Sequence, residues 1–257
     1  MPSGLAVNSR WERLPSESDG LSMFVAEPEG PGPFAGIVCF HTMAGVNTNL
    51  QETAQRIASY GCVVVAPNLF HRATKATEFR MPEERERAES AFASTDFYSV
   101  AADSREALNF LRASPTVDPD RLGTIGYCIG GTWSFLAACF NRDVRAAVVA
   151  YGTGIVSGPK TPGKPIEPIA LADRIQGPML WLSGSADQFI PRADVEAMGE
   201  RMDRLGKQCD LRVYNGEPAA GHAFFSADQP RFYNEGAASW GWKIKLDFIQ
   251  RHLIIHA

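Results

Sequence analysis

A cysteine occupies a position in this chain where residue types and spacing favour nucleophilic chemistry. The segment GYCIG (126–130) has the pattern Gly-x-nucleophile-x-Gly, follows an apolar strand-like run and opens a helix-like one. Glycines on both sides allow a strained turn in which strand and helix approach closely. The start of the helix favours a thiolate and leaves the Ile129 amide free to bind an oxyanion. Cys128 is therefore predicted to be a nucleophile, with a buried cysteine in a glycine-rich turn as the alternative.

Two further residues could complete a catalytic triad with Cys128. A thiol nucleophile needs a base and a group that orients the base, and in folds built around such a turn they follow in the order nucleophile, acid, histidine. Asp187 follows the apolar run MLWLS, and His222 follows the strand-like LRVYN. Each alone is typical of an ordinary loop residue. Their joint occurrence in this order predicts that Cys128, His222 and Asp187 form a triad.

The elements that must position these residues alternate along the chain. Apolar runs rich in β-branched residues alternate with longer segments of helical periodicity, which is typical of βα units around a mostly parallel sheet. Strands are predicted at Leu21–Val25, Ala35–Phe40, Cys62–Ala66, Arg121–Gly126, Ala146–Tyr151, Met179–Ser183 and Leu211–Tyr214. Helices are predicted at Thr48–Tyr60, Thr95–Ala113, Ile129–Phe140, Arg192–Leu205 and Pro230–His252. The order favours βαβ units throughout, in a single α/β domain of residues 1–257.

Two segments break this pattern. Arg72–Phe92 carries the charged run PEERERAES, whose alternating signs are more typical of an exposed helix face than of a binding patch. Gly152–Asp173 contains GPKTPGKPIEP, which is too rich in proline and glycine for a helix or an interior strand. A long surface loop is predicted there, and long loops in compact domains often act as lids.

Length, composition and charge exclude several classes of protein. The chain has 257 residues, of which 45% are hydrophobic, so it can bury a substantial core. Its net charge is −4 and it has no long basic run, so nucleic acid is not expected as a partner. No leader and no apolar run of roughly 20 residues is present, which predicts a cytoplasmic protein without membrane contact. The five cysteines lack ligand spacing, which predicts neither disulfides, metal nor another cofactor.

The sequence resembles the dienelactone hydrolase (carboxymethylenebutenolidase) family of α/β-hydrolases over nearly its whole length. The matching segments are GIVCFHTMAGVN, VVVAPNLFHR, GTIGYCIGG, AYGTG, GSADQFIP and AGHAFF, followed by a long C-terminal helix. The resemblance implies an α/β-hydrolase fold, with a mostly parallel central sheet and helices on both faces. It also implies that Cys128, Asp187 and His222 are the family's triad and that the Met43 amide is the second oxyanion donor.

Two departures from the family pattern concern activation and substrate. The family's first loop usually carries a glutamate that helps to activate the thiol, whereas the aligned residue here is Thr42, which cannot ionise. We therefore expect Cys128 to rest closer to a thiolate–imidazolium pair with His222. The family's arginine shortly after the histidine is also missing, and an apolar pocket is predicted instead. Its candidate contacts are Thr42, Phe224 and Phe225, and the candidate cations are Arg80, Arg85 and Arg87.

These residues predict hydrolysis of a small-molecule ester or lactone through a thioester on Cys128. A carboxylesterase or thioesterase without lactone preference is the first alternative. The second is a scaffold that does not hydrolyse anything, in which Cys128 senses oxidants or the pocket binds a ligand. The chain is expected to be a monomer or a homodimer.

Overall fold

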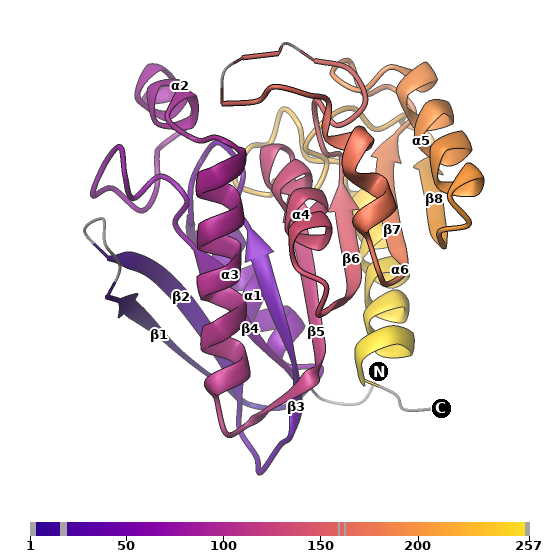
Figure 1. Cartoon of the computed structure of the whole chain (residues 1–257). Coiled ribbons are helices and arrows are strands. Elements are labelled where there is room, and N and C mark those ends of the chain that lie inside the picture. Colours follow the sequence, from indigo (N-terminus) through magenta and orange to yellow (C-terminus); the bar gives the residue numbers. More distant parts are fainter. Residues whose placement is uncertain (1–3, 16–19, 159, 162, 255–257) are drawn as a thin grey trace.

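One sheet of eight strands forms the centre of the structure, in the order β1-β2-β4-β3-β5-β6-β7-β8 (Figure 1). This computed structural model describes residues 4–15, 20–158, 160–161 and 163–254. The strands are β1 (Val7–Leu14), β2 (Leu21–Pro28), β3 (Phe34–Phe40), β4 (Cys62–Pro67), β5 (Val117–Tyr127), β6 (Val144–Ala150), β7 (Met179–Gly184) and β8 (Cys209–Tyr214). β2 pairs antiparallel with both β1 and β4. Every other pair of neighbouring strands, from β4 through β3, β5, β6 and β7 to β8, is parallel.

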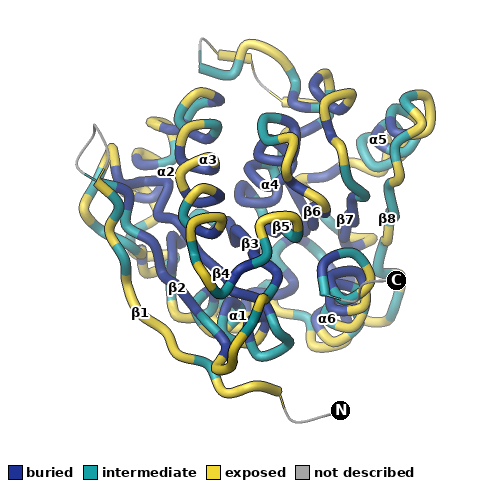
Figure 2. The backbone as a smooth tube through the Cα atoms, turned by 60° about the horizontal axis from the view of Figure 1, so that its bottom comes forward, coloured by how far each residue is buried: buried dark blue, intermediate teal, exposed yellow. Residues whose placement is uncertain are grey.

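Helices cover both faces of this sheet. They are α1 (Thr48–Ala58), α2 (Arg85–Ala93), α3 (Phe97–Ala113), α4 (Ile129–Phe140), α5 (Arg192–Arg204) and α6 (Glu235–Ile249), with a short 3₁₀ turn η1 (Pro168–Arg174) and a π turn η2 (Gln250–Ile254). α3, α4 and α5 lie on one face, and α1 and α6 on the other (Figures 1 and 2). None of the helices in the described part of the chain is long and apolar enough to cross a membrane.

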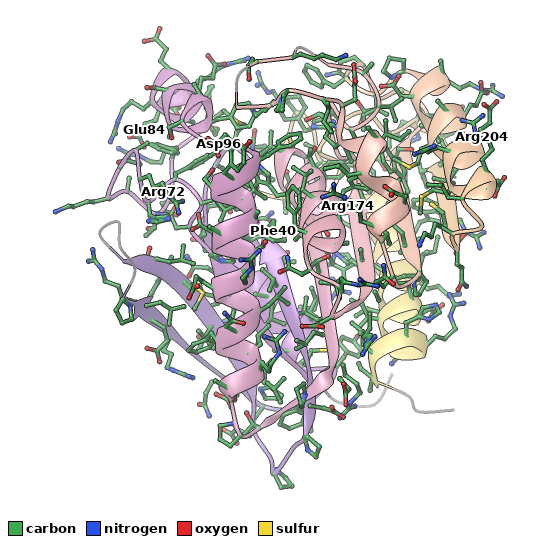
Figure 3. All side chains as sticks on the ribbon, viewed as in Figure 1. Phe40, Arg72, Glu84, Asp96, Arg174 and Arg204 are labelled. Carbon is green, nitrogen blue, oxygen red and sulfur yellow. The ribbon has the colours of Figure 1, made fainter. Side chains whose placement is uncertain are left out.

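The core lies between the sheet and these two helix layers (Figure 2). Because both faces are covered, a central strand such as β4 is buried along its whole length and reads as a continuous apolar run. Phe40 at the end of β3 is fully buried, whereas Glu84 and Arg204 lie at the periphery (Figure 3). The core therefore holds β3 to β7 as one rigid support.

The mostly parallel sheet with helices on both faces is confirmed, but some local expectations change. The prediction of βαβ units throughout is wrong at the N-terminal edge, where β1 and β2 are antiparallel. The sequence did not indicate β1 because an edge strand exposed to solvent is polar, here VNSRWERL. The exposed helix face predicted for the charged run of Arg72–Phe92 is confirmed by α2, whereas the end of the predicted loop Gly152–Asp173 forms part of the 3₁₀ turn η1.

The strand order gathers the candidate residues at one edge of the sheet. β3, β5, β6 and β7 are parallel neighbours, so their carboxyl ends lie side by side. Thr42 and Met43 follow β3, Cys128 follows β5, and Asp187 follows β7. Ligand and catalytic sites of open α/β sheets collect at this edge.

Two glycines make the sharp turn between β5 and α4 possible. A Cβ atom on Gly126 would lie 1.8 Å from the Gly130 carbonyl oxygen. A Cβ atom on Gly130 would lie 2.4 Å from the carbonyl oxygens of both Phe40 and His41. These neighbours are backbone atoms that cannot turn away, so only glycine lets helix α4 start this close to β3 and β5.

Replacing Gly126 with alanine should therefore be strongly destabilising. We expect Gly126→Ala to lower the free energy of unfolding by about 1–3 kcal/mol, because the added methyl group overpacks the turn. Gly199→Ala is the matched control, since its methyl group would meet only the end of the Leu211 side chain, and a change below about 1 kcal/mol is expected. Urea denaturation of the two variants gives both values. Equal stability of Gly126→Ala and wild type would contradict this account of the turn.

Candidate active site

Cys128 lies in a left-handed turn between β5 and α4. Its φ is 58° and its ψ is −124°, a conformation that costs a non-glycine residue about 1–3 kcal/mol. The Cys128 N–H donates to the Ala150 carbonyl at 3.0 Å, which fastens the turn to β6. Among the described residues, the other non-glycine positions with positive φ are Tyr151 at 41° and Ala223 at 60°. Since Ala223 follows His222, backbone strain is concentrated around the candidate triad.

Asp187 and His222 form a buried hydrogen-bonded pair. His222 Nδ1 donates to Asp187 Oδ2 at 2.9 Å, and the Phe189 N–H donates to the other oxygen, Oδ1, at 2.9 Å. The side chains of His222 and Asp187 are only 7% and 1% exposed, so water screens their attraction little. The Ala186 N–H also donates to the Ala220 carbonyl at 2.9 Å and ties the two loops together. The imidazole orientation is therefore fixed from both sides.

His222 Nε2 is the ring nitrogen that Asp187 does not contact. It is buried and, within the described residues, meets no atom with the distance and angle of a hydrogen bond. The rings of Tyr151 and Phe189 pack edge-on against the imidazole, with centroids 5.1 and 5.0 Å away. Burial lowers the pKa of His222, but the hydrogen bond with Asp187 and the contact with Cys128 outweigh burial and raise this pKa to about 10. The imidazole next to Cys128 thus holds its proton at neutral pH.

Two backbone amides are available to bind an oxyanion. The Ile129 N–H belongs to the first residue of α4 and has no partner within the helix. Within the described residues, neither this N–H nor that of Met43 donates to another group. Both are predicted oxyanion donors. The Ile129 amide directly follows Cys128, and the Met43 amide lies in the loop after β3.

His41 anchors the loop that carries Met43. Its Nδ1 donates to the Thr42 carbonyl at 2.7 Å, and its Nε2 accepts from the Leu69 N–H at 3.1 Å. Accepting at Nε2 requires the neutral imidazole, and complete burial lowers the pKa of His41 to about 4. The Gly45 N–H also donates to the Thr42 carbonyl, at 3.1 Å. The loop conformation is therefore set by a histidine that stays neutral near pH 7.

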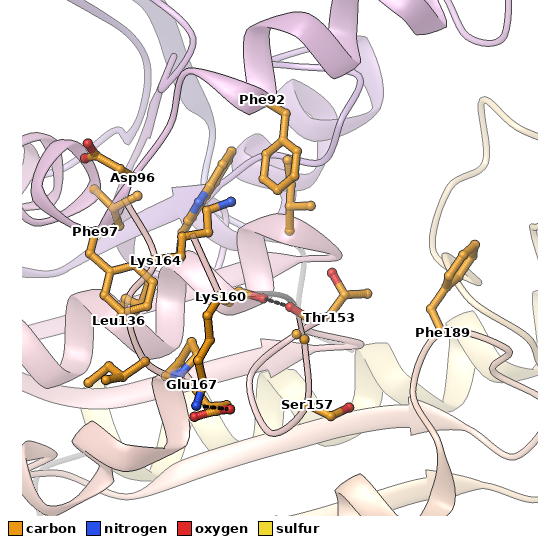
Figure 4. Close-up of a pocket in the computed structure, with 18 residues that line it drawn as sticks. Phe92, Asp96, Phe97, Leu136, Thr153, Ser157, Lys160, Lys164, Glu167 and Phe189 are labelled. Atoms are coloured by element: carbon orange, nitrogen blue, oxygen red, sulfur yellow. Dashed lines mark hydrogen bonds and ion pairs between the residues drawn. The ribbon is translucent and has the colours of Figure 1, made fainter. Parts of the chain in front are cut away.

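A cavity of about 330 Å³ opens beside these groups (Figure 4). Its lining includes Ile129, the residue after Cys128, and Phe189, whose ring packs against the His222 imidazole. Its walls are mainly apolar and come from α3, α4 and the loop that leads into η1. Apolar lining residues are Phe92, Phe97, Val100, Trp133, Leu136, Ile166 and Pro168. This volume is in the range of sites for small organic ligands.

The predicted substrate contacts do not line this cavity. Phe224 is fully buried against the Tyr151 ring, with centroids 5.1 Å apart. Phe225 and Thr42 instead border a small hollow near α1, and the Thr42 hydroxyl accepts from the Ala44 N–H at 3.1 Å. Trp133, in the mainly apolar helix α4, does line the cavity. Apolar residues of core and pocket look alike in sequence.

The candidate arginines also lie elsewhere. Arg85 pairs with Glu89 at 2.7 Å, and Arg80 and Arg87 pair with Glu84, all around exposed α2. None of these arginines lines the cavity. The cations that line the cavity are instead Lys160 and Lys164 of the proline-rich loop, a segment whose sequence showed no periodicity that would indicate a binding role.

Among the described residues, no group of three or more histidine, cysteine, aspartate or glutamate side chains is arranged to hold a metal ion. All five cysteines are free thiols; Cys39, Cys62 and Cys139 are buried, while Cys128 and Cys209 are partly exposed. Burial raises the pKa of Cys39 and of Cys62 to about 12, so these two stay protonated.

A sequence model of the dienelactone hydrolase family matches residues 21–253. This chain belongs to the dienelactone hydrolase family. The match includes the nucleophile turn, the Asp187 loop and the His222 loop, and it confirms the resemblance and the α/β-hydrolase fold. As a member of this family, the chain is a hydrolase.

Curated relatives and solved structures agree with this assignment. A protein of Methylorubrum extorquens named "Putative carboxymethylenebutenolidase" is 30% identical over 240 residues, which cover 93% of this chain and 80% of that protein. One of the same name from Synechocystis is 29% identical, over 93% of this chain and 95% of that protein. The crystal structure named for a "Putative Dienelactone Hydrolase" of Klebsiella pneumoniae superposes with a TM-score of 0.84 at 26% identity, covering 96% of this chain and all of that one.

The raised pKa of His222 predicts a pH-dependent contribution of Asp187 to stability. A histidine whose folded pKa exceeds its unfolded value of about 6.5 stabilises the fold fully below that value, and this stabilisation is lost as pH rises to the folded pKa, about 10. Wild type should therefore exceed Asp187→Asn in stability most near pH 6, with a difference that shrinks towards pH 10. Urea denaturation of both proteins across this range measures it. A difference that is constant or grows with pH would contradict the assignment.

Proposed function

We propose that this chain hydrolyses ester or lactone bonds with Cys128 as nucleophile, His222 as proton carrier and Asp187 as the group that orients His222. One observation carries the proposal. Cys128 is held in a strained turn that ends in a free helix amide, at the same sheet edge as the buried His222–Asp187 pair. A solvated loop histidine would need neither the pair nor the strain.

The proposed reaction begins with attack of the Cys128 sulfur on the carbonyl carbon. A C–S bond forms, the carbonyl oxygen becomes an oxyanion, and the amides of Ile129 and Met43 bind that oxygen. The C–O bond to the leaving alkoxide then breaks as His222 Nε2 gives it a proton, which leaves a thioester on Cys128. In a lactone the alcohol stays attached to the acyl group.

Water completes the cycle. Neutral His222 takes a proton from the water, hydroxide adds to the thioester carbonyl, and the C–S bond breaks to release the acid and restore the thiolate. The high pKa of His222 supports an imidazolium beside the sulfur in the resting enzyme, as expected where Thr42 replaces an ionisable glutamate. One oxygen of Asp187 accepts from the Phe189 N–H and the other accepts from His222 Nδ1. This fixed pair keeps His222 Nε2 directed towards the reacting groups.

A carboxylesterase or thioesterase without lactone preference is the second candidate. The same three residues would serve it, and the mainly apolar cavity of about 330 Å³ favours it. The two candidates differ in the acyl group that is accepted and share the thioester step.

Hydrolysis of a panel of substrates tests the proposal. The panel is a dienelactone, p-nitrophenyl acetate, p-nitrophenyl butyrate and an acyl thioester, with wild type, Cys128→Ala and the control Cys209→Ala. We expect Cys128→Ala to lower kcat at least about a thousandfold on every accepted substrate, and Cys209→Ala to be nearly as active as wild type.

The preferred substrate of the panel separates the two candidates. Activity retained in Cys128→Ala would refute the nucleophile. Rapid alkylation of Cys128 without hydrolysis of any substrate would instead favour a scaffold that senses oxidants or binds a ligand.

A further inference from the structure

Among the described ionisable residues that line the cavity, one cation makes no ion pair. Asp96 Oδ1 accepts from the Ser99 N–H at 2.7 Å and caps α3. Lys160 pairs with Glu167 at 3.0 Å. Lys164, by contrast, makes no ion pair with any residue in the described part of the chain, although it lines the same cavity.

Lys164 is half-buried against an aromatic wall. Its Nζ lies 4.0 Å from the centre of the Phe92 ring (Figure 4). Burial lowers the pKa of Lys164, and the more distant Asp96 carboxylate opposes this only in part. An ammonium group in such a place is attracted to any anion that enters, because the apolar walls screen the interaction less than water does.

The loop that carries Lys164 is fixed to α3. Thr161 and Lys164 exchange both backbone hydrogen bonds, at 3.0 and 2.9 Å, and the Phe97 N–H donates to the Gly163 carbonyl at 3.0 Å. A Cβ atom on Gly163 would lie 2.7 Å from Asp96 Cβ, so the loop packs closely on the start of α3. Lys164 is thus presented from a defined backbone position.

Lys164 lines the same cavity as two neighbours of the catalytic groups: Ile129, which follows Cys128, and Phe189, whose ring packs against His222. Cys128, Asp187 and His222 themselves lie just outside its lining. Ile129 and Phe189 mark the reaction end, and Figure 4 shows Phe189 well apart from Lys164 and Phe92. Most of the lining is apolar, including Trp133 and Leu136, and its polar residues include Thr132, Thr153 and Ser157. An acyl group held at Cys128 would therefore run along apolar walls before it reaches a cation.

We propose that Lys164 forms a carboxylate subsite, so that the preferred substrate has an extended apolar acyl chain ending in a carboxylate. This inference rests on the proposed function, since it assumes that the acyl group is attached at Cys128. The carboxylate replaces the missing counter-ion of Lys164, and the chain between the two ends fills the apolar part of the cavity. Lys164, rather than Arg80, Arg85 or Arg87, then determines specificity for acid-ended substrates.

Matched esters test the subsite. The substrates are p-nitrophenyl hexanoate and the mono-p-nitrophenyl esters of succinic, adipic and suberic acids. The variants are Lys164→Met, Lys164→Arg and the control Lys243→Met, which removes an exposed lysine of α6. In wild type we expect kcat/KM for the best acid-ended ester to exceed that for the hexanoate about tenfold, as for a charge-assisted hydrogen bond.

Lys164→Met should abolish this preference and leave hydrolysis of the hexanoate within about twofold, while Lys164→Arg and Lys243→Met keep most of the preference. Equal loss on neutral and acid-ended esters would show that Lys164 only supports the loop, and would overturn the proposal. The proposal would also be overturned if wild type showed no preference for acid-ended esters at any chain length, or if Lys164→Met kept that preference.

A measurement without turnover separates this subsite from the proposed function. Adipic acid monoanilide and hexananilide are amides that should occupy the cavity without rapid cleavage, and each can protect Cys128 from iodoacetamide. Stronger protection by the acid-ended anilide in wild type, lost in Lys164→Met, would support the subsite even if no ester were hydrolysed. Equal protection by both anilides, together with ester hydrolysis, would overturn the subsite and leave the proposed function intact.

Discussion

The left-handed backbone at Cys128 is the constraint on which the rest of the site depends. A cysteine in that conformation is costly, so surrounding contacts must hold it there. The hydrogen bond to the Ala150 carbonyl does so from β6, and the absence of side chains at Gly126 and Gly130 lets α4 begin against β3 and β5. The same turn puts the sulfur at the sheet edge and leaves the Ile129 amide unpaired beside it. The proposed nucleophile and the proposed oxyanion donor are thus both positioned by one piece of backbone geometry.

The remaining groups reach this turn because parallel strands end side by side. β7 leads into Asp187, and the loop after β8 returns with His222, so the two residues meet although 35 positions separate them in sequence. On the other side, β3 leads into the Met43 loop, whose shape depends on neutral His41. His222 and His41 differ because His222 has a carboxylate partner, Asp187, which raises the pKa of His222, whereas burial lowers the pKa of His41.

The sequence allowed prediction of the parts of the site that depend on local motifs and strand order. The turn around Cys128 has a steric requirement for glycine, Asp187 follows the buried apolar strand β7, and His222 lies in the loop after β8. All three therefore lie at the same edge of the sheet. Polar β1 and the cavity could not be predicted in the same way. Phe224 and Trp133 are both apolar, and only the folded structure distinguishes them: Trp133 packs against Phe70 and Phe92 and lines the cavity, while Phe224 is fully buried. Lys164 lies in a proline-rich loop whose position is set by its contact with the start of α3.

The central claim is that catalysis passes through an acyl group on Cys128. The most direct measurement is peptide mass spectrometry after acid quenching of wild type during hydrolysis of an activated ester. We predict the added mass of the acyl group on the peptide that contains Cys128 during turnover, its disappearance when substrate is exhausted, and its absence in Cys128→Ala. Sustained hydrolysis with no acyl group on Cys128, or with the acyl group on another residue, would contradict the account.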